Sequence, residues 1–260
     1  MPQSFENARG EVIVLPRGLR VSGFDRPAVV TLARGGLGHE VVRRTLDPAR
    51  GVLEGALVGA TYAEAQAKLD ALLAFLHHQP LRFRRHAPTD PYLVVWTEGL
   101  DDSGTTVGKA AQVRVPLIAP DPLRVGDPQG YPGGANYQDV TGDTYAFAIT
   151  NVGTAPVPLT VYMRPPASGG VAHLPIIENL TTGQSARYNA ALLSGQELVV
   201  DGRAHAAVVE EGAQQTVVTD LMSNAFLVGG LHLAPGENNL RVTVALPGVR
   251  FRLAYTARYY

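Results

Sequence analysis

TYAEAQAKLDALLAFL, residues 61–76, carries a helical pattern in a chain otherwise composed of short strand-like runs. Thr61 and Glu64 have the T-x-x-E spacing of a capping box, which marks the start of a helix. The segment HHQP, residues 77–80, ends the pattern. We therefore predict one amphipathic helix over residues 62–78 that lies on a β-sheet. Its apolar face comprises Ala65, Leu69, Leu72, Leu73 and Leu76.

Short apolar runs bounded by Gly, Pro or Asp lie on both sides of this helix, and such runs are typical of strands. They cover residues 11–15, 27–33, 39–46 and 51–59 before the helix, and 81–85, 91–98 and 112–119 after it. The pattern predicts a mainly β protein. Its N-terminal domain, residues 1–122, is expected to be a β-sandwich or barrel-like domain carrying the one helix.

The second half of the chain has no convincing helical period. Residues 123–142, LRVGDPQGYPGGANYQDVTG, are rich in Pro and Gly, so we predict a linker there. Residues 143–260 contain about nine short β-like runs, a pattern typical of an antiparallel β-sandwich or jelly roll. Its first hairpin is predicted in NVGTAPVPLTVYM, residues 151–163, with Leu159, Val161 and Met163 facing the core.

The composition excludes several kinds of site. The net charge of −1 over 260 residues does not favour nucleic acid or an anionic membrane as a partner. There are no cysteines, which excludes disulfides, thiolate metal sites and a cysteine nucleophile. Since no apolar run has the length of a signal peptide or a membrane span, we expect a soluble protein without membrane insertion, made in the cytoplasm or carried in a particle assembled there.

Two glycine-containing stretches resemble phosphate-binding motifs without meeting their requirements. GTTVGKA, residues 104–110, has three residues between its glycines and Ala110 after the lysine, whereas a Walker A motif needs four residues and then Ser or Thr. RGGLGHE, residues 34–40, lacks the G-x-G-x-x-G spacing. A hairpin loop is the better interpretation of the first stretch, and a turn of the second. GQSAR, residues 183–187, likewise departs from the G-x-S-x-G elbow of serine hydrolases at its last position.

The polar residues do not form a pattern expected of a catalytic or metal site. His77 and His78 are adjacent on the predicted helix, whereas a helical two-histidine site needs i and i+4 spacing. The pairs Asp101–Asp102 and Glu210–Glu211 are typical of solvated loop charges rather than an acid/base couple. We therefore predict no catalytic, cofactor-binding or metal-binding residues, no cofactor and no enzyme activity.

Two further features have a structural and a functional interpretation. Arg82 and Arg84 share one face of a predicted strand, opposite Leu81 and Phe83, so an exposed strand face is preferred over a phosphate site. Trp96 could form a platform on which a sugar stacks, but a single Trp within YLVVWTE is more typical of a core.

Several segments, taken in this order, resemble the distal tail protein of long-tailed, siphovirus-type bacteriophages, the phage tail component family. The first is the strand set with the helix of residues 61–76 and the strand LRFRR. The second is VRVPLIAPDPLR, residues 113–124. The third is the C-terminal series of NVGTAPVPLTVYM, TTGQSARYNAALLSGQELVVD, LHLAPGENNLRVTV and FRLAYTARYY.

The resemblance implies a structural protein of the virion, located at the tail tip and assembled in the host cytoplasm. Its N-terminal domain would form a homo-oligomeric ring, usually a hexamer, and its C-terminal sandwich would resemble galectins and carbohydrate modules in fold. The implied partners are the tail tube protein, the tape-measure protein and the tail-tip hub or tail-lysin protein, with DNA present only in transit. The alternative is a carbohydrate-binding or adhesin-like module that contacts host surface glycans.

Overall fold

The computed structural model describes residues 3–24, 31–34, 40–43, 48–86, 89–100, 104–167, 169–245 and 248–260, and of 31–34 and 40–43 only the backbone. The chain divides into two compact units, Met1–Val125 with Tyr260, and Gly126–Tyr259. Among the described helices, none is long and apolar enough to cross a bilayer.

The first unit is one strand-rich layer with one helix. Its elements are β1 (Ser4–Glu6), β2 (Val12–Val14), β3 (Leu19–Gly23), β4 (Thr31–Arg34), β5 (Glu40–Arg43), β6 (Ala49–Val58), α1 (Tyr62–Leu76), β7 (Leu81–Arg84), β8 (Leu93–Thr97), β9 (Gly104–Val107) and β10 (Ala110–Ala119). Within the described residues, the main sheet has the order β2-β1-β7-β8-β10-β6-β3, with β9 paired to β10, and β4 pairs with β5.

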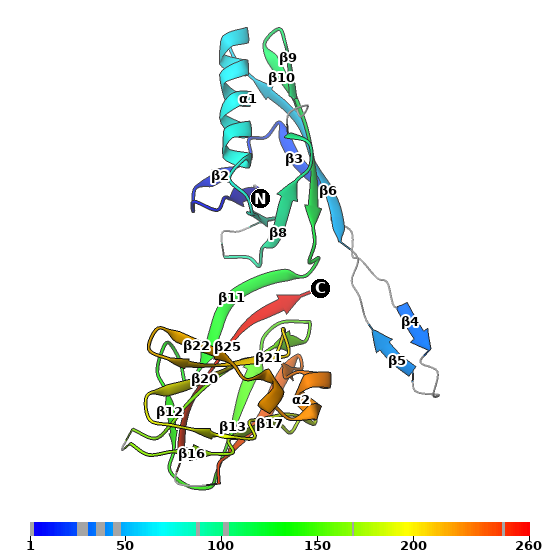
Figure 1. The fold of residues 1–260 in the computed structure, drawn as a ribbon. Helices are drawn as coiled ribbons and strands as arrows, with labels where there is room; N and C mark the ends of the chain where they lie inside the picture. The colour runs from blue at the N-terminus through cyan, green and yellow to red at the C-terminus, as the bar shows by residue number, and fades with distance from the viewer. Residues whose placement is uncertain are drawn as a thin grey trace. The chain divides into compact units, whose positions relative to one another are not determined.

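Helix α1 confirms the helix predicted from the opening stretch and ends at Leu76, two residues earlier than expected. The Thr61 side chain accepts a hydrogen bond from the Glu64 amide at 3.2 Å, and the Glu64 carboxylate accepts one from the Ala60 amide at 2.7 Å. The helix lies along β6, β9 and β10 (Figure 1). Its buried residues join one core with the inward-facing residues of the sheet.

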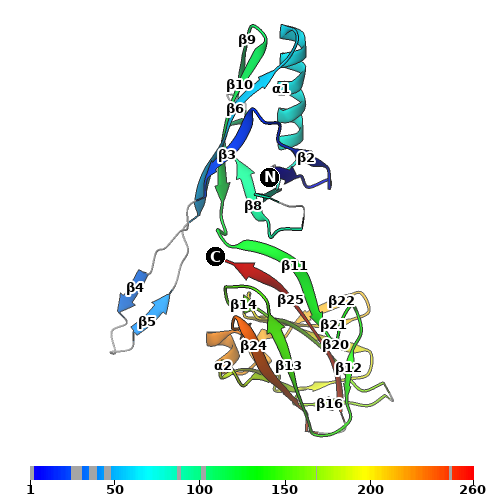
Figure 2. The same cartoon turned by 180° about the vertical axis from the view of Figure 1, so that it is seen from behind.

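The second unit contains two larger antiparallel sheets. Its elements are β11 (Arg124–Tyr131), which begins two residues before the boundary between the units, β12 (Gln138–Val140), β13 (Thr144–Asn151), β14 (Val157–Pro158), β15 (Thr160–Arg164), β16 (Ala172–His173), β17 (Ile176–Asn179), β18 (Gln184–Arg187), β19 (Ala191–Leu192), β20 (Gln196–Asp201), β21 (Ala206–Glu211), β22 (Gln214–Val217), α2 (Asn224–Gly229), β23 (His232–Leu233), β24 (Gly236–Thr243) and β25 (Val249–Tyr259). One sheet has the order β11-β25-β15-β20-β21-β22 with β12 paired to β25, and the other β13-β24-β17-β18, in which β13 and β24 lie side by side (Figure 2).

Two of these sequence-based predictions need correction, and several elements were missed. Most of the predicted linker, residues 123–142, is not a linker, because β11 and β12 within it both pair with β25. The predicted hairpin at residues 151–163 is wrong, since β13 pairs with β24 whereas β15 pairs with β20 and β25 in the other sheet. The short helix α2 was not predicted, and neither were β1 and β3.

The predicted alternation in the same stretch is confirmed. Leu159, Val161 and Met163 are at most 1% exposed, whereas Thr160 and Tyr162 are partly exposed. The alternating pattern of side chains therefore fixed which face of β15 enters the core, although it did not determine the partner strands.

An aromatic cluster lies at the edge of the second core. The rings of Tyr131 and Phe147 stack with centroids 4.4 Å apart, and Phe147 packs on Phe251 at 5.1 Å. The Tyr131 and Tyr145 hydroxyls are 2.9 Å apart. Burial, together with this hydrogen bond, raises the pKa of Tyr131 to about 12.

This shift predicts a loss of stability in alkali. Because an unfolded tyrosine has a pKa of about 10, the contribution of Tyr131 is fully present below pH 10 and is lost as the pH rises to about 12. In an alkaline absorbance titration at the wavelength of tyrosinate, Tyr131 should contribute a late ionisation step near pH 12. That late step should be missing in Tyr131→Phe. An unchanged titration curve in the variant would contradict the assignment.

Candidate subunit interface

One face of the main sheet of the first unit is covered, and the other is open. Residues at odd positions of β6 and β10, such as Leu53 and Val115, are buried on the side of α1. The even positions are partly or fully exposed along both strands. Since successive side chains of a strand point to opposite faces, the even residues form a continuous open face. This face is a candidate contact surface.

Exposed apolar residues lie at one end of this open face. Ala110 of β10 is paired with Val58 of β6 on one side and with Val107 of β9 on the other. Val58 and Val107 are 66% and 69% exposed. We call these three residues the valine strip. Large exposed apolar side chains on a strand face are unfavourable in water, so such a strip is a candidate for contact with another protein surface.

Trp96 lies on the same open face and is 37% exposed, next to Ile118 of β10. The preferred interpretation of Trp96 as a core residue is therefore wrong. The physical reason is its even position in β8, which places it on the side away from the buried Leu93 and Val95.

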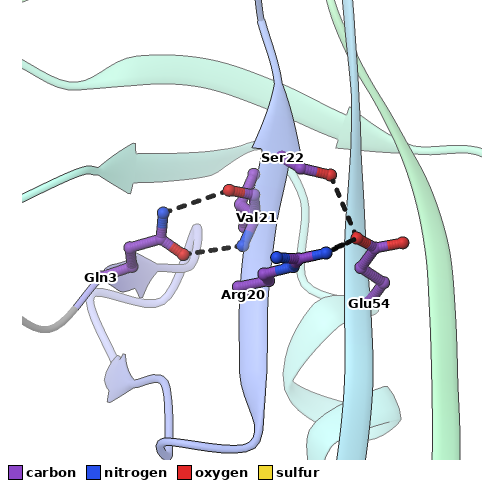
Figure 3. Close-up of polar contacts among 5 residues, drawn as sticks. All are labelled: Gln3, Arg20, Val21, Ser22 and Glu54. Carbon is purple, nitrogen blue, oxygen red and sulfur yellow. Dashed lines mark hydrogen bonds and ion pairs between the residues drawn. The ribbon is translucent and has the colours of Figure 1, made fainter.

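The middle of the open face is polar. A groove of about 550 Å³ crosses it, and its walls include Arg17, Arg20, Glu54, Thr105, Gln112 and Arg114. Arg20 contacts Glu54 through Nε at 3.2 Å and Nη2 at 3.0 Å, and the Ser22 hydroxyl is 3.4 Å from the same carboxylate oxygen (Figure 3). These contacts connect β3 to β6 on the open face.

Edge strands offer a second kind of contact. In the described part of the main sheet, β2 and β3 are the end strands. Val12 and Val14 of β2 are 62% and 57% exposed. EVIVL, residues 11–15, is one of the strands predicted from the sequence, and its exposed valines lie on such an edge. The predicted strand at residues 27–33 lies wholly outside the residues whose side chains are described.

The basic cluster around Phe83 is an ion-paired strand face. Arg82 and Arg84 each lie 2.8 Å from the Glu6 carboxylate, and both guanidinium groups lie 5.1 Å from the centre of the Tyr92 ring. The hydrogen bond from Arg84 and the positive charges of both arginines lower the pKa of Glu6. The alternation with buried Leu81 and Phe83 is as predicted.

In the second unit, the arginines and tyrosines of one sheet contact each other. Arg252 lies 3.5 Å above the centre of the Tyr162 ring, and its Nε donates to the Tyr137 hydroxyl at 3.1 Å. Tyr137 also hydrogen-bonds Glu197, which Arg164 contacts at 2.6 Å. Desolvation and the Glu197 hydrogen bond raise the pKa of Tyr137. The Tyr137 and Tyr162 rings therefore stack against arginine guanidinium groups. Among the described residues of Gly126–Tyr259, no aromatic side chain is strongly exposed.

The residues considered for chemistry are dispersed. No group of three or more His, Asp or Glu side chains that could hold a metal occurs among the described residues. His77 is the C-cap of α1. His205 and His232 have ring centroids 6.4 Å apart, and burial, with a smaller contribution from His205, lowers the pKa of His232. Asp101 and Asp102 lie outside the described residues.

Two further motifs have structural roles, one as the sequence predicted and one not. Residues 104–110 form the β9–β10 hairpin, in agreement with the loop interpretation of GTTVGKA. Glu210 and Glu211 lie on strand β21 rather than in a loop, and accept hydrogen bonds from Gln215 and Gln196. The loop interpretation of the two glutamates failed because a polar run at the end of a strand, just before a hairpin turn, has the same composition as a loop.

Comparison with known proteins finds this architecture among solved structures of phage proteins. No protein-family model matches the chain, and no curated protein matches it significantly. Among solved structures, the crystal structure of the Dit protein of phage SPP1, described as a paradigm of the hub adsorption apparatus in phages that infect Gram-positive bacteria, matches over 99% of both chains at 14% identity with a TM-score of 0.63. The phage P2 baseplate in its activated conformation with Ca matches over 98% of both chains at 9% identity with a TM-score of 0.43. The chain therefore has a mainly β fold of the Dit type, like that of the SPP1 protein, over nearly its whole length.

Proposed function

We propose that this chain is a structural protein of a bacteriophage tail, a distal tail component of the baseplate hub that joins the tail tube to the tail-tip apparatus. The observation that carries the proposal is the match to SPP1 Dit over 99% of both chains. Because one fold can serve several functions, the proposal also needs support from the exposed surfaces of this chain.

The surfaces of the first unit suit self-association into a ring. A closed ring needs a heterologous interface, in which one patch meets a different patch on the next copy. The valine strip and the exposed valines of β2 are two distinct apolar patches on this unit. We propose a homo-oligomeric ring, a hexamer, whose subunits contact each other through the first unit.

The proposed ring has neighbours in the tail. These are the tail tube protein, the tape-measure protein and the tail-tip hub or tail-lysin protein, and DNA passes through the lumen only in transit. A net charge of −1 favours passage of DNA over its retention, since each phosphate contact adds salt-dependent affinity. In this role the protein is a component of the virion with no catalytic step of its own.

Light scattering coupled to size-exclusion chromatography, together with negative-stain electron microscopy, tests the ring. We expect the purified chain to run as a discrete oligomer, with closed ring outlines and the mass of six copies. A strict monomer at high protein concentration would contradict self-association, and an open filament would contradict ring closure.

The valine strip makes a specific prediction about this oligomer. Val107→Glu should place a carboxylate in the proposed contact and shift the oligomer toward monomer by at least about tenfold in dissociation constant, since an unpaired buried charge costs several kcal/mol. Val217→Glu is the matched control, because Val217 of β22 in the second unit is also exposed, at 72%. Equal oligomer masses for the two variants at all concentrations would exclude the valine strip as a subunit contact.

A further inference from the structure

The C-terminal turn of α2 is held by side chains from two other parts of the second unit. Gln184 of β18 donates through Nε2 to the Gly229 carbonyl at 3.0 Å. His205, in the turn between β20 and β21, lies with Nδ1 3.1 Å from the Leu227 carbonyl. The last four carbonyls of a helix lack the usual partner within the helix, so these two side chains satisfy groups that would otherwise need water.

Phe226 is the part of α2 that these contacts keep covered. Its side chain is 0% exposed and belongs to the core of the second unit, together with Leu231 just after the helix. Since α2 has six residues and Phe226 is the buried one, the packing of the helix depends largely on this ring. Loosening of the C-terminal turn would therefore uncover Phe226.

The rings of His205 and His232 converge on Gly230, the C-cap of α2. A Cβ at position 230 would lie 2.8 Å from Nε2 of His205 and 2.9 Å from Cε1 of His232. The centroids of the two rings are 6.4 Å apart. Because both rings lie against the backbone that ends the helix, a change in the charge of either ring acts directly on that turn.

The hydrogen bonds assign the protons of these rings. A carbonyl oxygen only accepts, so Nδ1 of His205 carries a hydrogen. The Gln184 Oε1 accepts from the His232 amide at 2.9 Å, which makes Nε2 the donor end of that carboxamide. The same Nε2 lies 3.4 Å from Nδ1 of His232. Since a carboxamide nitrogen cannot accept, Nδ1 of His232 is the acceptor, and this ring is neutral with its hydrogen on Nε2.

The contacts of the His232 ring oppose a second proton on it. A hydrogen on Nδ1 would point at the amide hydrogens of Gln184 and remove their acceptor. The partial burial of His232 disfavours its charged form, and the neighbouring His205 adds a second ring that can become positive. Both causes lower the pKa of His232, and burial is the larger.

In the described part of the chain, no carboxylate contacts the His232 ring. The residue opposite it on β14 is Pro158, and from β17 the Asn179 amide bonds the His232 carbonyl at 2.7 Å. Helix α2 has no charged residue. The turn after β20 adds Arg203, a cation, and Asp201, whose carboxylate accepts from the Arg203 amide at 2.7 Å. A proton on His232 would therefore add a charge without a partner.

We propose that His232, His205 and Gln184 form an acid-sensitive latch on α2. While His232 is neutral, the C-terminal turn of α2 stays closed over Phe226, and protonation of His232 opens it. Because the pKa of His232 is lowered in the folded chain, its support for the closed turn is fully present above the ordinary histidine pKa of about 6.5 and is lost as the pH falls through the lowered pKa. The inference concerns the second unit alone and holds whether or not the chain forms the proposed ring.

Hydrogen–deuterium exchange followed by mass spectrometry tests the latch in the full chain. The protection factor corrects for the intrinsic pH dependence of exchange. Over residues 224–230 it should be constant above pH 7 and fall about fivefold or more by pH 4.5. Residues 196–201 of β20 should keep their protection, which separates opening of α2 from unfolding of the whole unit. Constant protection over residues 224–230 down to pH 4.5, or an equal loss in β20, would overturn the latch.

Histidine variants test which residue causes the fall in protection. The side chain in His232→Gln does not titrate, so residues 224–230 should keep the same protection from pH 7.5 to pH 4.5. His173→Gln is the matched control, because His173 of β16 is exposed and the substitution is identical, and it should show the wild-type fall. A wild-type fall in His232→Gln, or the absence of a fall in His173→Gln, would refute the role of His232.

His205→Gln keeps the proposal testable if His232→Gln does not fold. Its glutamine amide can still donate to the Leu227 carbonyl, whereas the second ring that can become positive is gone. The loss of protection over residues 224–230 at pH 4.5 should therefore be smaller than in the wild-type chain. An equal or larger loss would show that the two rings do not act together on α2.

Discussion

Asn238→Ala should destabilise the second unit by about 3 kcal/mol or more, although it deletes only a small polar side chain. Asn238 is fully buried at the start of β24. Its side-chain nitrogen donates to the carbonyls of Ala234 and Gly236 at 2.8 and 3.0 Å, and its oxygen accepts from the Ala234 amide at 2.9 Å. Removal of the carboxamide leaves these part-buried backbone groups and one donor of the buried Asn179 side chain without their partner, and each buried group left in this way costs about 1–3 kcal/mol.

The effect should extend to a second strand because Asn238 also contacts Asn179. The Asn179 side-chain nitrogen donates to the Asn238 oxygen at 3.1 Å and to the His232 carbonyl at 2.7 Å, and Asn179 is itself fully buried. These two asparagines therefore connect the end of β17 with the turn before β24. NLT, residues 179–181, matches the N-glycosylation sequon. Because Asn179 is buried, its side chain is not accessible for glycosylation in the folded chain.

Asn239→Ala is the matched control, because the neighbouring side chain is exposed and the substitution is identical. We expect a change within about 0.5 kcal/mol for it. Denaturant unfolding followed by far-ultraviolet circular dichroism measures both variants, and the fluorescence of Trp96, the one tryptophan, reports the first unit separately. Asn238→Asp should also destabilise at neutral pH, since it keeps the acceptor but loses the donors and buries a charge. Similar unfolding midpoints for Asn238→Ala and Asn239→Ala would refute the role of this side chain.

Local signals allowed the helix and several strands to be predicted. The capping box at Thr61 and the apolar positions of α1 lie within one segment, so the sequence determined both the start and the buried face. The alternation in residues 159–163 similarly determined the face of β15. Partner choice was not predictable in this way, because β13 and β15 are close in sequence and yet join different sheets. Such pairings depend on residues distant along the chain.

The missed strand β11 has a specific physical explanation. Pro128, Gly126 and Gly130 make its sequence resemble a linker, since Pro and Gly are depleted in strand interiors. In the structure β11 is an edge strand that pairs with β25 on one side. Proline is tolerated at a sheet edge because the missing N–H need not join a ladder. The six-residue helix α2 was missed for a different reason, as so short a segment cannot display a helical period.

The sequence predicted that the protein has contact surfaces, but not which residues form most of them. A strand-rich chain without a catalytic pattern indicates contact surfaces, and EVIVL was identifiable as an exposed strand with valines. The valine strip was not predictable, because Val58, Val107 and Ala110 become neighbours only through the pairing of three strands. The two hydrogen bonds between the Gln3 side chain and the Val21 backbone (Figure 3) likewise have no local sequence signal, since a single glutamine 18 residues before its partner has no characteristic spacing.

Gly55→Ala should destabilise the first unit by about 3–5 kcal/mol, because it combines backbone strain with a collision. Gly55 has φ of +140°, a conformation that L side chains rarely adopt. A Cβ at this position would lie 1.9 Å from the Gly18 carbonyl oxygen. That oxygen cannot move away freely, since it accepts the hydrogen bond from the Ala56 amide at 3.0 Å, where the chain enters β3. The substitution should therefore separate the start of β3 from β6.

Gly108→Ala isolates the contribution of backbone strain alone. Gly108 lies in the β9–β10 turn with φ of +60°, and an added Cβ would meet nothing within 4 Å. We expect this substitution to lower the free energy of unfolding by about 1 kcal/mol, as for other non-glycine residues with a left-handed backbone. Trp96 fluorescence during guanidinium unfolding measures both variants in the same unit. A loss for Gly55→Ala no greater than that for Gly108→Ala would show that Gly18 can move, and that the close approach of the two glycines does not hold β3 against β6.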